Sequence, residues 1–167
     1  MKTLHLLRHA KSAWDEPGLG DRERGLNGRG KRAAPAMGRA LAARLQPTVA
    51  SVSPARRAQL TLEGLCEGWP AMADLPHRSC EALYTFSADE VLDWLLAQDD
   101  ELQRLFLIGH NPAFTELINF LCGRWELDNL PTAGYAELSL DIDHWAQLRQ
   151  GGAQLVYTLF PKELSAL

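Results

Sequence analysis

Apolar residues along the chain follow two spacings that alternate for most of its length. Short continuous apolar runs predict buried strands, whereas apolar residues three and four positions apart predict amphipathic helices. Toward the C-terminus the pattern changes to strict alternation of apolar and polar residues, which also predicts strands. The predicted strands are residues 3–7, 48–52, 79–83, 105–108, 135–140 and 154–160.

Start signals precede the stretches with helical spacing. A polar residue that can accept a hydrogen bond from the first turn, followed by proline or by glutamate three positions on, is typical of a helix N-terminus. Pro35 lies inside the first predicted helix and is expected to kink it or to delay its regular start. The predicted openings are Asn27, Ser53-Pro54, Ser87–Glu90 and Asn111-Pro112.

The order of these elements predicts the fold class. Alternating strands and helices favour right-handed βαβ units around a mostly parallel sheet, and the two C-terminal strands favour an antiparallel edge. The expected architecture is a three-layer α/β/α sandwich. No internal repeat or linker interrupts the pattern, so residues 1–167 are expected to form a single domain.

Composition narrows the class of protein. Hydrophobic residues make up 46% of the chain and charged residues 23%, as in ordinary globular proteins. The three cysteines are widely separated, which argues against a disulfide framework or a zinc knuckle and fits a reducing compartment. No targeting pattern or apolar stretch of membrane-spanning length is present. A cytoplasmic protein without a membrane partner is therefore expected.

Charge is distributed unevenly along the chain. The first 61 residues hold 12 basic and 4 acidic side chains, whereas the rest holds 5 and 17. Such a basic segment favours an anionic ligand or nucleic acid. Aromatic residues do not interleave with the cations, which argues against nucleic acid as a partner. Most of these cations are expected to form the solvent-exposed face of the first helix: Arg29, Lys31, Arg32, Arg39 and Arg44.

Candidate chemistry gathers where the predicted strands end. Arg8-His9 follows the first strand, Arg56-Arg57 follows the second, and His110 follows the strand at residues 105–108. In open parallel sheets, ligands bind beyond the carboxyl ends of the strands. Guanidinium groups together with a helix N-terminus favour an anion, and planar arginine forks fit phosphate oxygens. The sequence therefore predicts a phosphate site at this edge.

Two histidines at such a site indicate more than binding. A neutral imidazole nitrogen can attack phosphorus and form a phosphohistidine, while a protonated imidazole can stabilise charge on the phosphoryl oxygens. Close positive groups keep both rings from being cationic at once. His9 is the predicted nucleophile and His110 the predicted charge-stabilising group.

Four motifs, in order, resemble those of the histidine phosphatase (phosphoglycerate mutase-like) superfamily: LLRHAKSAW, LNGRG, SPARRAQLT and GHNP. The length and the segments EALY and LPTAGYAEL are most similar to its SixA-type phosphohistidine phosphatase branch. The resemblance covers nearly the whole chain. Departures from the family pattern are Ala10 in place of glycine, Asn27 in place of threonine and Leu60 where glutamine is common.

The resemblance implies a set of site residues. His9 would be the phosphorylated nucleophile, and Arg8, Arg57 and His110 would complete the phosphate pocket. Arg57 rather than Arg56 fits the family position, because it directly precedes the alanine of the Arg-Ala pair. Asn111 is expected to help bind the phosphate.

The general acid is the least defined part of the predicted site. Alkyl phosphates need a carboxylic acid that protonates the departing alkoxide. Glu81 in CEALY is a candidate for this role, and an exposed carboxylate at a strand end is the alternative. A phosphohistidine substrate would lessen the need, since imidazole is a good leaving group that carries its own proton.

Other polar residues are interpreted as structural or solvated. His5 is expected to be a structural strand residue, because at strand spacing it lies about 13 Å from His9, too far to share a metal ion. Lys11 and Ser12 are candidates for the mouth of the pocket. The acids of the loop after the first strand, Asp15, Glu16, Asp21 and Glu23, are expected to be solvated.

These interpretations together predict a phosphatase that needs no metal and no cofactor, and that passes a phosphoryl group to His9 and then to water. Its partner would be a phosphorylated protein carrying phosphohistidine or a small phosphorylated metabolite. Two alternatives stay open: a small-molecule phosphomonoesterase on the same scaffold, and a non-catalytic phosphate-binding domain. The sequence specifies neither the physiological substrate nor the oligomeric state.

Overall fold

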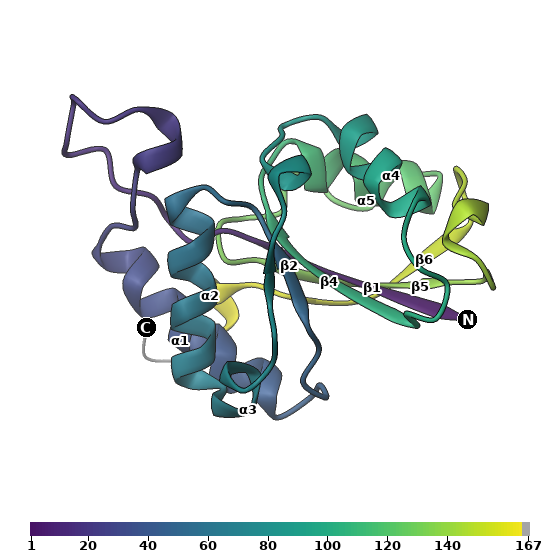
Figure 1. Ribbon diagram of the computed structural model, residues 1–167, viewed down its shortest axis with the longest axis horizontal. Helices are drawn as coiled ribbons and strands as arrows, with labels where there is room; N and C mark the ends of the chain where they lie inside the picture. The colour runs from purple at the N-terminus through teal and green to yellow at the C-terminus, as the bar shows by residue number, and fades with distance from the viewer. Residues whose placement is uncertain (165–167) are drawn as a thin grey trace.

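A computed structural model describes residues 1–164 and contains one six-stranded sheet between two layers of helices (Figure 1). The strand order is β3-β2-β4-β1-β5-β6. The strands are β1 (Lys2–Arg8), β2 (Ala50–Val52), β3 (Arg78–Ser79), β4 (Arg104–Gly109), β5 (Tyr135–Leu140) and β6 (Ala153–Leu159).

Strand directions match the expected mixed sheet. β1, β2, β3 and β4 are parallel, whereas β5 and β6 are antiparallel to their neighbours and form one edge. The central pair β1 and β4 are in register so that Arg8 lies beside Gly109. The residues that follow these two strands therefore leave the sheet at the same edge, and the three-layer α/β sandwich predicted from the sequence is confirmed.

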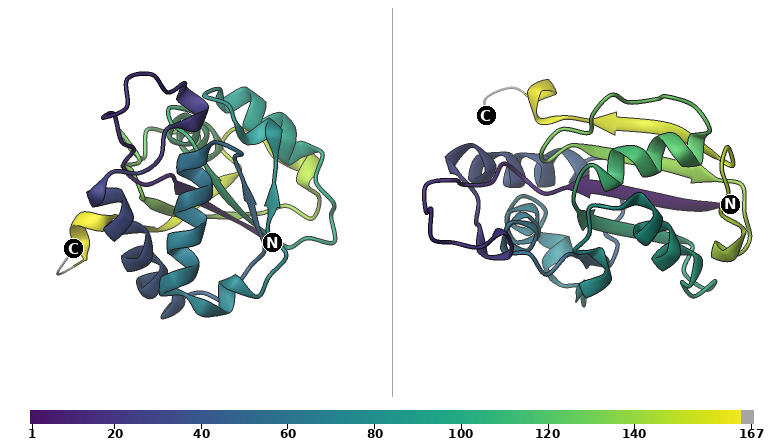
Figure 2. Two further views of the ribbon diagram at one scale, coloured as in Figure 1. Left: turned by 60° about the vertical axis from the view of Figure 1, so that its left-hand side comes forward. Right: turned by 90° about the horizontal axis from the view of Figure 1, so that it is seen from above.

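The helices cover both faces of this sheet (Figure 2). α1 (Gly28–Ala42), α2 (Arg56–Gly68) and the short α3 (Pro70–Ala73) lie on one face, while α4 (Ala88–Leu96) and α5 (Ala113–Cys122) lie on the other. Each face has its own hydrophobic cluster: Leu4, Leu6 and Leu107 point to α4 and α5, whereas Leu7, Phe106 and Ile108 point to α1 and α2. The alternation of side chains along buried strands produces these two cores.

Two of the four predicted helix starts are confirmed as caps, and α5 begins at Ala113, directly after the predicted Asn111-Pro112 opening. The Asn27 side chain accepts a hydrogen bond from the Gly30 N–H, and the Ser87 side chain accepts one from the Glu90 N–H. The helix after Ser53-Pro54 is an exception, because α2 begins at Arg56. The Ser53 hydroxyl instead bonds to the Ala55 N–H and to His110, so this serine joins two elements.

Two local predictions need correction. α1 begins at Gly28 and continues through Pro35, so the proline does not delay its start; the cap at Asn27 sets the first turn well before the proline. The strand expected at residues 79–83 is only the pair Arg78–Ser79, and residues 81–83 form a 3₁₀ turn closed by a Leu83 N–H to Cys80 carbonyl bond.

α1 and α2 pack at very close range. A Cβ atom at Gly38 would lie 2.2 Å from the Leu65 carbonyl oxygen, so only glycine allows this approach. The close approach holds α2 firmly against α1 on one face of the sheet. As a result, the first turn of α2, which carries Arg57, has a fixed position relative to the end of β1.

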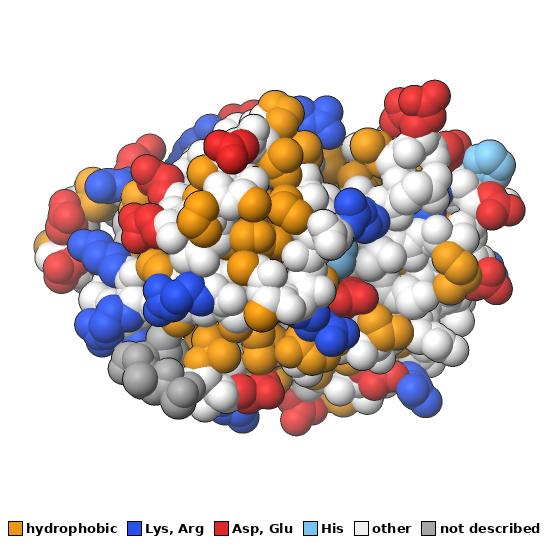
Figure 3. Space-filling model, turned by 90° about the horizontal axis from the view of Figure 1, so that it is seen from below, with side chains coloured by type: hydrophobic (Ala, Val, Ile, Leu, Met, Phe, Trp, Pro, Cys, Tyr) orange, Lys and Arg blue, Asp and Glu red, His pale blue; other side chains and the backbone are white. Residues whose placement is uncertain are grey.

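The basic residues of α1, and Arg44 just beyond its end, are exposed as the sequence predicts. Arg29, Lys31, Arg32, Arg39 and Arg44 are all exposed. Figure 3, which views the molecule from below, shows acidic and basic side chains interspersed around a central group of hydrophobic ones. Among residues 1–164, no helix is both long enough and apolar enough to cross a membrane.

Candidate active site

His9 lies directly beyond the end of β1. Its backbone N–H donates to the Gly109 carbonyl at 3.0 Å, and its carbonyl accepts from the Ala133 N–H at 3.0 Å. The Nδ1 atom lies 2.7 Å from the Ala10 carbonyl oxygen. Because a carbonyl oxygen only accepts, Nδ1 carries the proton, and Nε2 is left with a free lone pair. This ring is therefore held in the tautomer that a nucleophile needs.

His110 lies beyond the neighbouring strand β4, and the centroid of its ring is 5.3 Å from that of His9. Its Nδ1 lies 3.4 Å from the Arg57 Nη2, a group that only donates, so Nδ1 is the acceptor. Its Nε2 then donates to the Ser53 hydroxyl at 2.7 Å. The pairing of β1 with β4 thus places the two imidazoles side by side, as expected from the sequence.

Arg8 and Arg57 enter the same site from β1 and α2. The structure turns Arg57 inward, with only 2% of the residue exposed, and leaves its neighbour Arg56 exposed. Arg8 donates through Nη1 to the Leu130 carbonyl at 2.9 Å. Within the described residues, the Nε groups of both arginines are buried and lack a hydrogen-bond partner. Unpaired buried donors of this kind are stabilised by an anionic ligand.

Asp21 has contacts that the sequence did not predict. Its side chain is solvent-exposed, as expected, but it also accepts two hydrogen bonds from Arg57, one through its carbonyl at 2.6 Å and one through Oδ2 at 3.0 Å. The Tyr84 hydroxyl donates to the same Oδ2 at 2.5 Å. These bonds, with the charge of Arg57, lower the pKa of Asp21 to about 2 against the opposing effect of burial. The loop that carries Asp21 therefore folds back onto the site and orients the guanidinium of Arg57.

Glu81 lies at the rim rather than against the histidines. Its two carboxylate oxygens accept from Arg22 Nη2 at 2.9 and 3.0 Å, and its side chain is 70% exposed. No hydrogen bond joins it to His9 or His110 in residues 1–164. Its carboxylate is thus held by Arg22 at the exposed rim of the site.

Asn111 is occupied by protein contacts. Its amide nitrogen donates to Asn129 and to the Leu130 carbonyl, and its oxygen accepts from the Thr115 N–H and hydroxyl. A carboxamide has two donor hydrogens and two acceptor lone pairs, so all four are used. The Asn111 side chain thus positions the Leu130 carbonyl that binds Arg8, and its carboxamide has no donor left for a phosphate.

Burial makes both site histidines weak bases. Desolvation lowers the pKa of His9 to about 3; the hydrogen bond to Ala10 opposes this effect, while the charges of His110, Arg57 and Arg8 add to it. Desolvation, followed by the charge of Arg57, lowers the pKa of His110 to about 4. Both rings are therefore neutral near pH 7 in the free protein. Negative charge brought by a ligand would raise both pKa values.

His5, which lies outside the site, is a third histidine whose pKa is lowered by burial. It lies buried in β1, bonded through Nδ1 to the Tyr135 hydroxyl at 2.6 Å, and desolvation lowers its pKa to about 4. This placement confirms its predicted structural role. Over residues 1–164, no three His, Cys, Asp or Glu side chains form a group suited to a metal ion.

These buried histidines predict an acid-sensitive fold. Their folded pKa values, about 3 to 4, lie below the usual 6.5, so between pH 6.5 and 4 the unfolded chain binds protons that the folded chain excludes. The free energy of unfolding should therefore fall as the pH is lowered through this window, by about 1.4 kcal/mol for each pKa unit and group. Urea unfolding at a series of pH values measures this slope, and His5→Gln should reduce it. An unchanged free energy down to pH 4.5 would contradict the prediction.

Several contributors to the site have no signal in their local sequence. Asp21 and Tyr84 lie on separate loops, and their roles depend on how those loops meet Arg57. Phe86 packs its ring against His110, with centroids 5.4 Å apart. Thr61 and Tyr84 lie within the quoted motifs SPARRAQLT and EALY, but neither motif predicted their contacts; the Thr61 hydroxyl accepts from the Ala10 N–H and donates to the Arg57 carbonyl.

The sequence of this chain is similar to a known protein family and to a curated protein. Residues 4–86 match the model of the histidine phosphatase superfamily, branch 1. An uncharacterized protein of Mycobacterium tuberculosis is 34% identical over 161 residues, which cover 90% of this chain and 96% of that protein.

Solved structures extend the likeness to nearly the whole chain. A crystal structure provisionally assigned as the phosphohistidine phosphatase SixA of Agrobacterium tumefaciens has a TM-score of 0.78 and 27% identity, covering 96% of this chain and 98% of that one. The protein histidine phosphatase SixA in complex with tungstate also has a TM-score of 0.78, at 22% identity and the same coverage. A provisionally assigned alpha-ribazole-5'-P phosphatase of Escherichia coli, with a TM-score of 0.71 and 16% identity over 96% and 98%, shares the fold.

Proposed function

The chain belongs to the histidine phosphatase superfamily, of the SixA type, and on this basis we propose that it hydrolyses phosphohistidine in proteins through a phosphorylated His9. One observation carries the proposal: two neutral imidazoles, with ring centroids 5.3 Å apart, lie close to the buried Arg57 and the half-buried Arg8 at the carboxyl edge of the sheet. In this proposal the enzyme needs no metal ion or cofactor, works in the cytoplasm and consists of one domain.

In the first step, the lone pair on His9 Nε2 attacks phosphorus and forms a P–N bond, while the bond to the leaving group breaks. The guanidinium groups of Arg8 and Arg57, whose charges act on His9, supply positive charge and hydrogen bonds to the phosphoryl oxygens. His110 takes up a proton as the phosphate dianion arrives, because negative charge raises its low pKa. It then stabilises the charge that spreads over the transferred group.

In the second step, water attacks the phosphorus of phosphorylated His9 and the P–N bond breaks. Inorganic phosphate leaves with the protons of the attacking water, and the electron pair returns to Nε2, so the ring is neutral again. As the negative charge leaves, His110 releases its proton to solvent and returns to the neutral form. The hydrogen bond from Nδ1 to the Ala10 carbonyl is kept throughout and holds the ring in one tautomer. The reaction thus consumes one water and one phosphorylated group in each turnover.

The choice of phosphohistidine depends on the leaving group. Glu81 is ion-paired with Arg22 at the rim, Asp21 is held by Arg57, and within residues 1–164 neither carboxyl group forms a hydrogen bond with His9 or His110 from which it could protonate an alkoxide. The imidazole of a phosphohistidine substrate can leave with its own proton. Exposed aromatic residues at the rim, Phe86 against His110 and Trp125 in a cavity of about 500 Å³ shared with Arg8, offer contact area for a protein substrate.

Comparing three substrates tests this proposal. The wild type should hydrolyse a phosphohistidine protein and p-nitrophenyl phosphate in the presence of EDTA, and should hydrolyse an alkyl phosphate at least about 10²-fold less efficiently in kcat/KM, the range that general acid catalysis supplies. Glu81→Gln should leave kcat/KM for the first two within about twofold, as expected for a residue that does not assist their leaving groups.

The remaining outcomes separate the alternatives. Equal efficiency on alkyl phosphates, lost in Glu81→Gln, would make the protein a small-molecule phosphomonoesterase with Glu81 as its acid. Loss of all turnover in EDTA would contradict the metal-free mechanism. Phosphate binding without turnover of any phosphorylated compound would leave a non-catalytic domain.

A further inference from the structure

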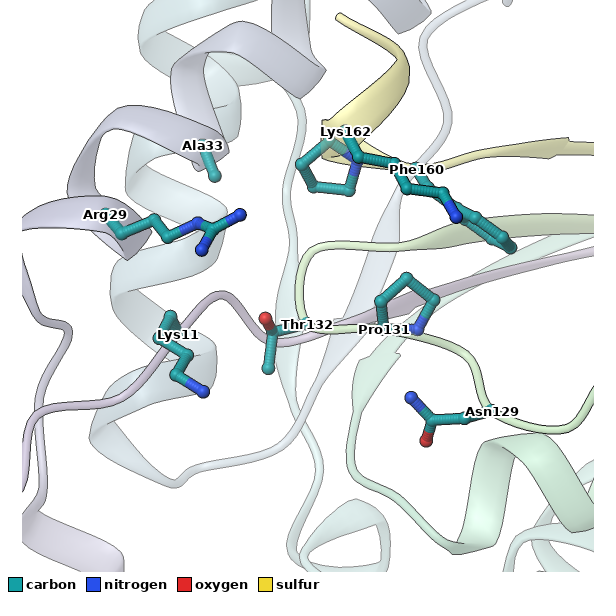
Figure 4. Close-up of a pocket in the computed structure, with 9 residues that line it drawn as sticks. Lys11, Arg29, Ala33, Asn129, Pro131, Thr132, Phe160 and Lys162 are labelled. Atoms are coloured by element: carbon teal, nitrogen blue, oxygen red, sulfur yellow. The ribbon is translucent and has the colours of Figure 1, made fainter.

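A second cavity lies next to the phosphate site, with a volume of about 380 Å³. Three basic side chains line it: Lys11 from the segment after β1, Arg29 from the first turn of α1, and Lys162 from the 3₁₀ turn at residues 161–163. Thr132 and Asn129 add polar atoms, and Phe160 adds an apolar wall. In Figure 4, the Arg29 and Lys11 side chains reach into the space beside Thr132, and Lys162 lies on the side of Phe160.

The charge of this cavity is unbalanced. No acidic side chain lines it, and none of its three cations forms an ion pair within residues 1–164. The neighbouring acid, Glu163, accepts a hydrogen bond from the Phe160 N–H instead. In a chain whose formal net charge is −4, three unpaired cations around one cavity form a local concentration of positive charge. Such a lining attracts anions.

The lining is also fixed relative to His9. Lys11 follows His9 by two residues, so their Cα atoms are at most about 7 Å apart. Thr132 precedes Ala133, whose N–H donates to the His9 carbonyl. The first turn of α1 presses against Lys11: a Cβ at Gly30 would lie 2.3 Å from the Lys11 carbonyl oxygen, so only glycine fits there.

We propose that this cavity is a subsite for a second anionic group on the substrate, carried by the molecule whose phosphoryl group His9 receives. The proposal rests on the proposed function and adds to it a preference for substrates that carry a second anionic group. Two sources share the required chemistry: an acidic side chain near the phosphohistidine of a protein, and a second phosphate on a small metabolite. Arginine and lysine side chains bind carboxylates and phosphates by charge-assisted hydrogen bonds.

Paired substrates that differ only in the second anion test the subsite. One pair is a hexose bisphosphate and the matching monophosphate; the other is a phosphohistidine peptide with acidic or with neutral flanking residues. The wild type should prefer the doubly anionic member of at least one pair in kcat/KM, and the pair that shows the preference identifies the source. Arg29→Ala should lower the preference about 5-fold and the Arg29→Ala, Lys162→Ala double variant about 10-fold or more, as for partly solvated charged contacts.

Arg32→Ala is the matched control, because Arg32 is an exposed arginine of the same helix that does not line the cavity. It should leave the preference within about twofold, and added salt should weaken the wild-type preference by screening. The proposal is overturned when both members of each pair are hydrolysed equally well, or when Arg32→Ala reduces the preference as much as Arg29→Ala. Absence of hydrolysis of every substrate would instead refute the proposed function, and the subsite would fall with it.

Discussion

Replacing His9 with alanine is expected to lower kcat on every substrate by at least about 10³-fold, the scale seen when the nucleophile of a covalent mechanism is removed. The structure orients no other side-chain nitrogen in the same way: His110 Nδ1, the other unprotonated ring nitrogen of the site, faces Arg57. The phosphorylated intermediate should disappear as well. Turnover of p-nitrophenyl phosphate and brief incubation with radiolabelled substrate, followed by denaturation, measure both effects.

His144→Ala provides the control for this experiment. His144 is exposed and bonded to Asp100, and it follows β5 beyond Leu140, which pairs with Lys2 at the opposite end of β1 from the site. This variant should retain wild-type kcat and the labelled intermediate. Retention of the phosphorylated intermediate in His9→Ala would show that another group accepts the phosphoryl group.

Replacing Arg57 with alanine is expected to lower kcat/KM by about 10²- to 10³-fold, as for the loss of one preorganised donor to a developing anion. Arg57 holds its guanidinium between Asp21 and His110, with Nε buried and unpaired within the described residues. The variant should also raise the pKa of His110, because the charge of Arg57 contributes to lowering it. Steady-state kinetics and histidine titration by NMR measure the two effects.

Arg56→Ala is a closely matched comparison, since Arg56 precedes Arg57 on the same helical turn but is exposed. It should change kcat/KM by no more than about twofold, as is usual for a solvated surface charge. Thermal unfolding of both variants separates catalysis from folding. Equal losses of activity in the two variants would contradict the assignment of Arg57 to the phosphate pocket.

Patterns along the chain determined much of the architecture. Apolar runs, helix caps and the change to alternation near the C-terminus predicted five of the six strands and the antiparallel edge, whereas the strand expected at residues 79–83 is only the pair Arg78–Ser79. They succeeded because burial of apolar side chains dictates the period of each element. Boundaries were less well predicted where short polar segments compete for backbone hydrogen bonds, as at Ser53, whose hydroxyl joins His110 instead of capping a helix.

The sequence by itself also predicted that Arg8, His9, Arg56-Arg57 and His110 lie together, because the ends of parallel strands meet at one edge of the sheet, and the family resemblance favoured Arg57 over Arg56. Only the tertiary structure decided how these groups are held. The tautomer of His9, the contact of Asp21 with Arg57 and the engagement of Glu81 by Arg22 depend on loops that meet across the fold. The local spacing of apolar residues carries no information about contacts between such loops, because these contacts depend on distances between residues that are remote in sequence. The cavity formed by Lys11, Arg29 and Lys162 arises in the same way, from three separate segments brought together by folding.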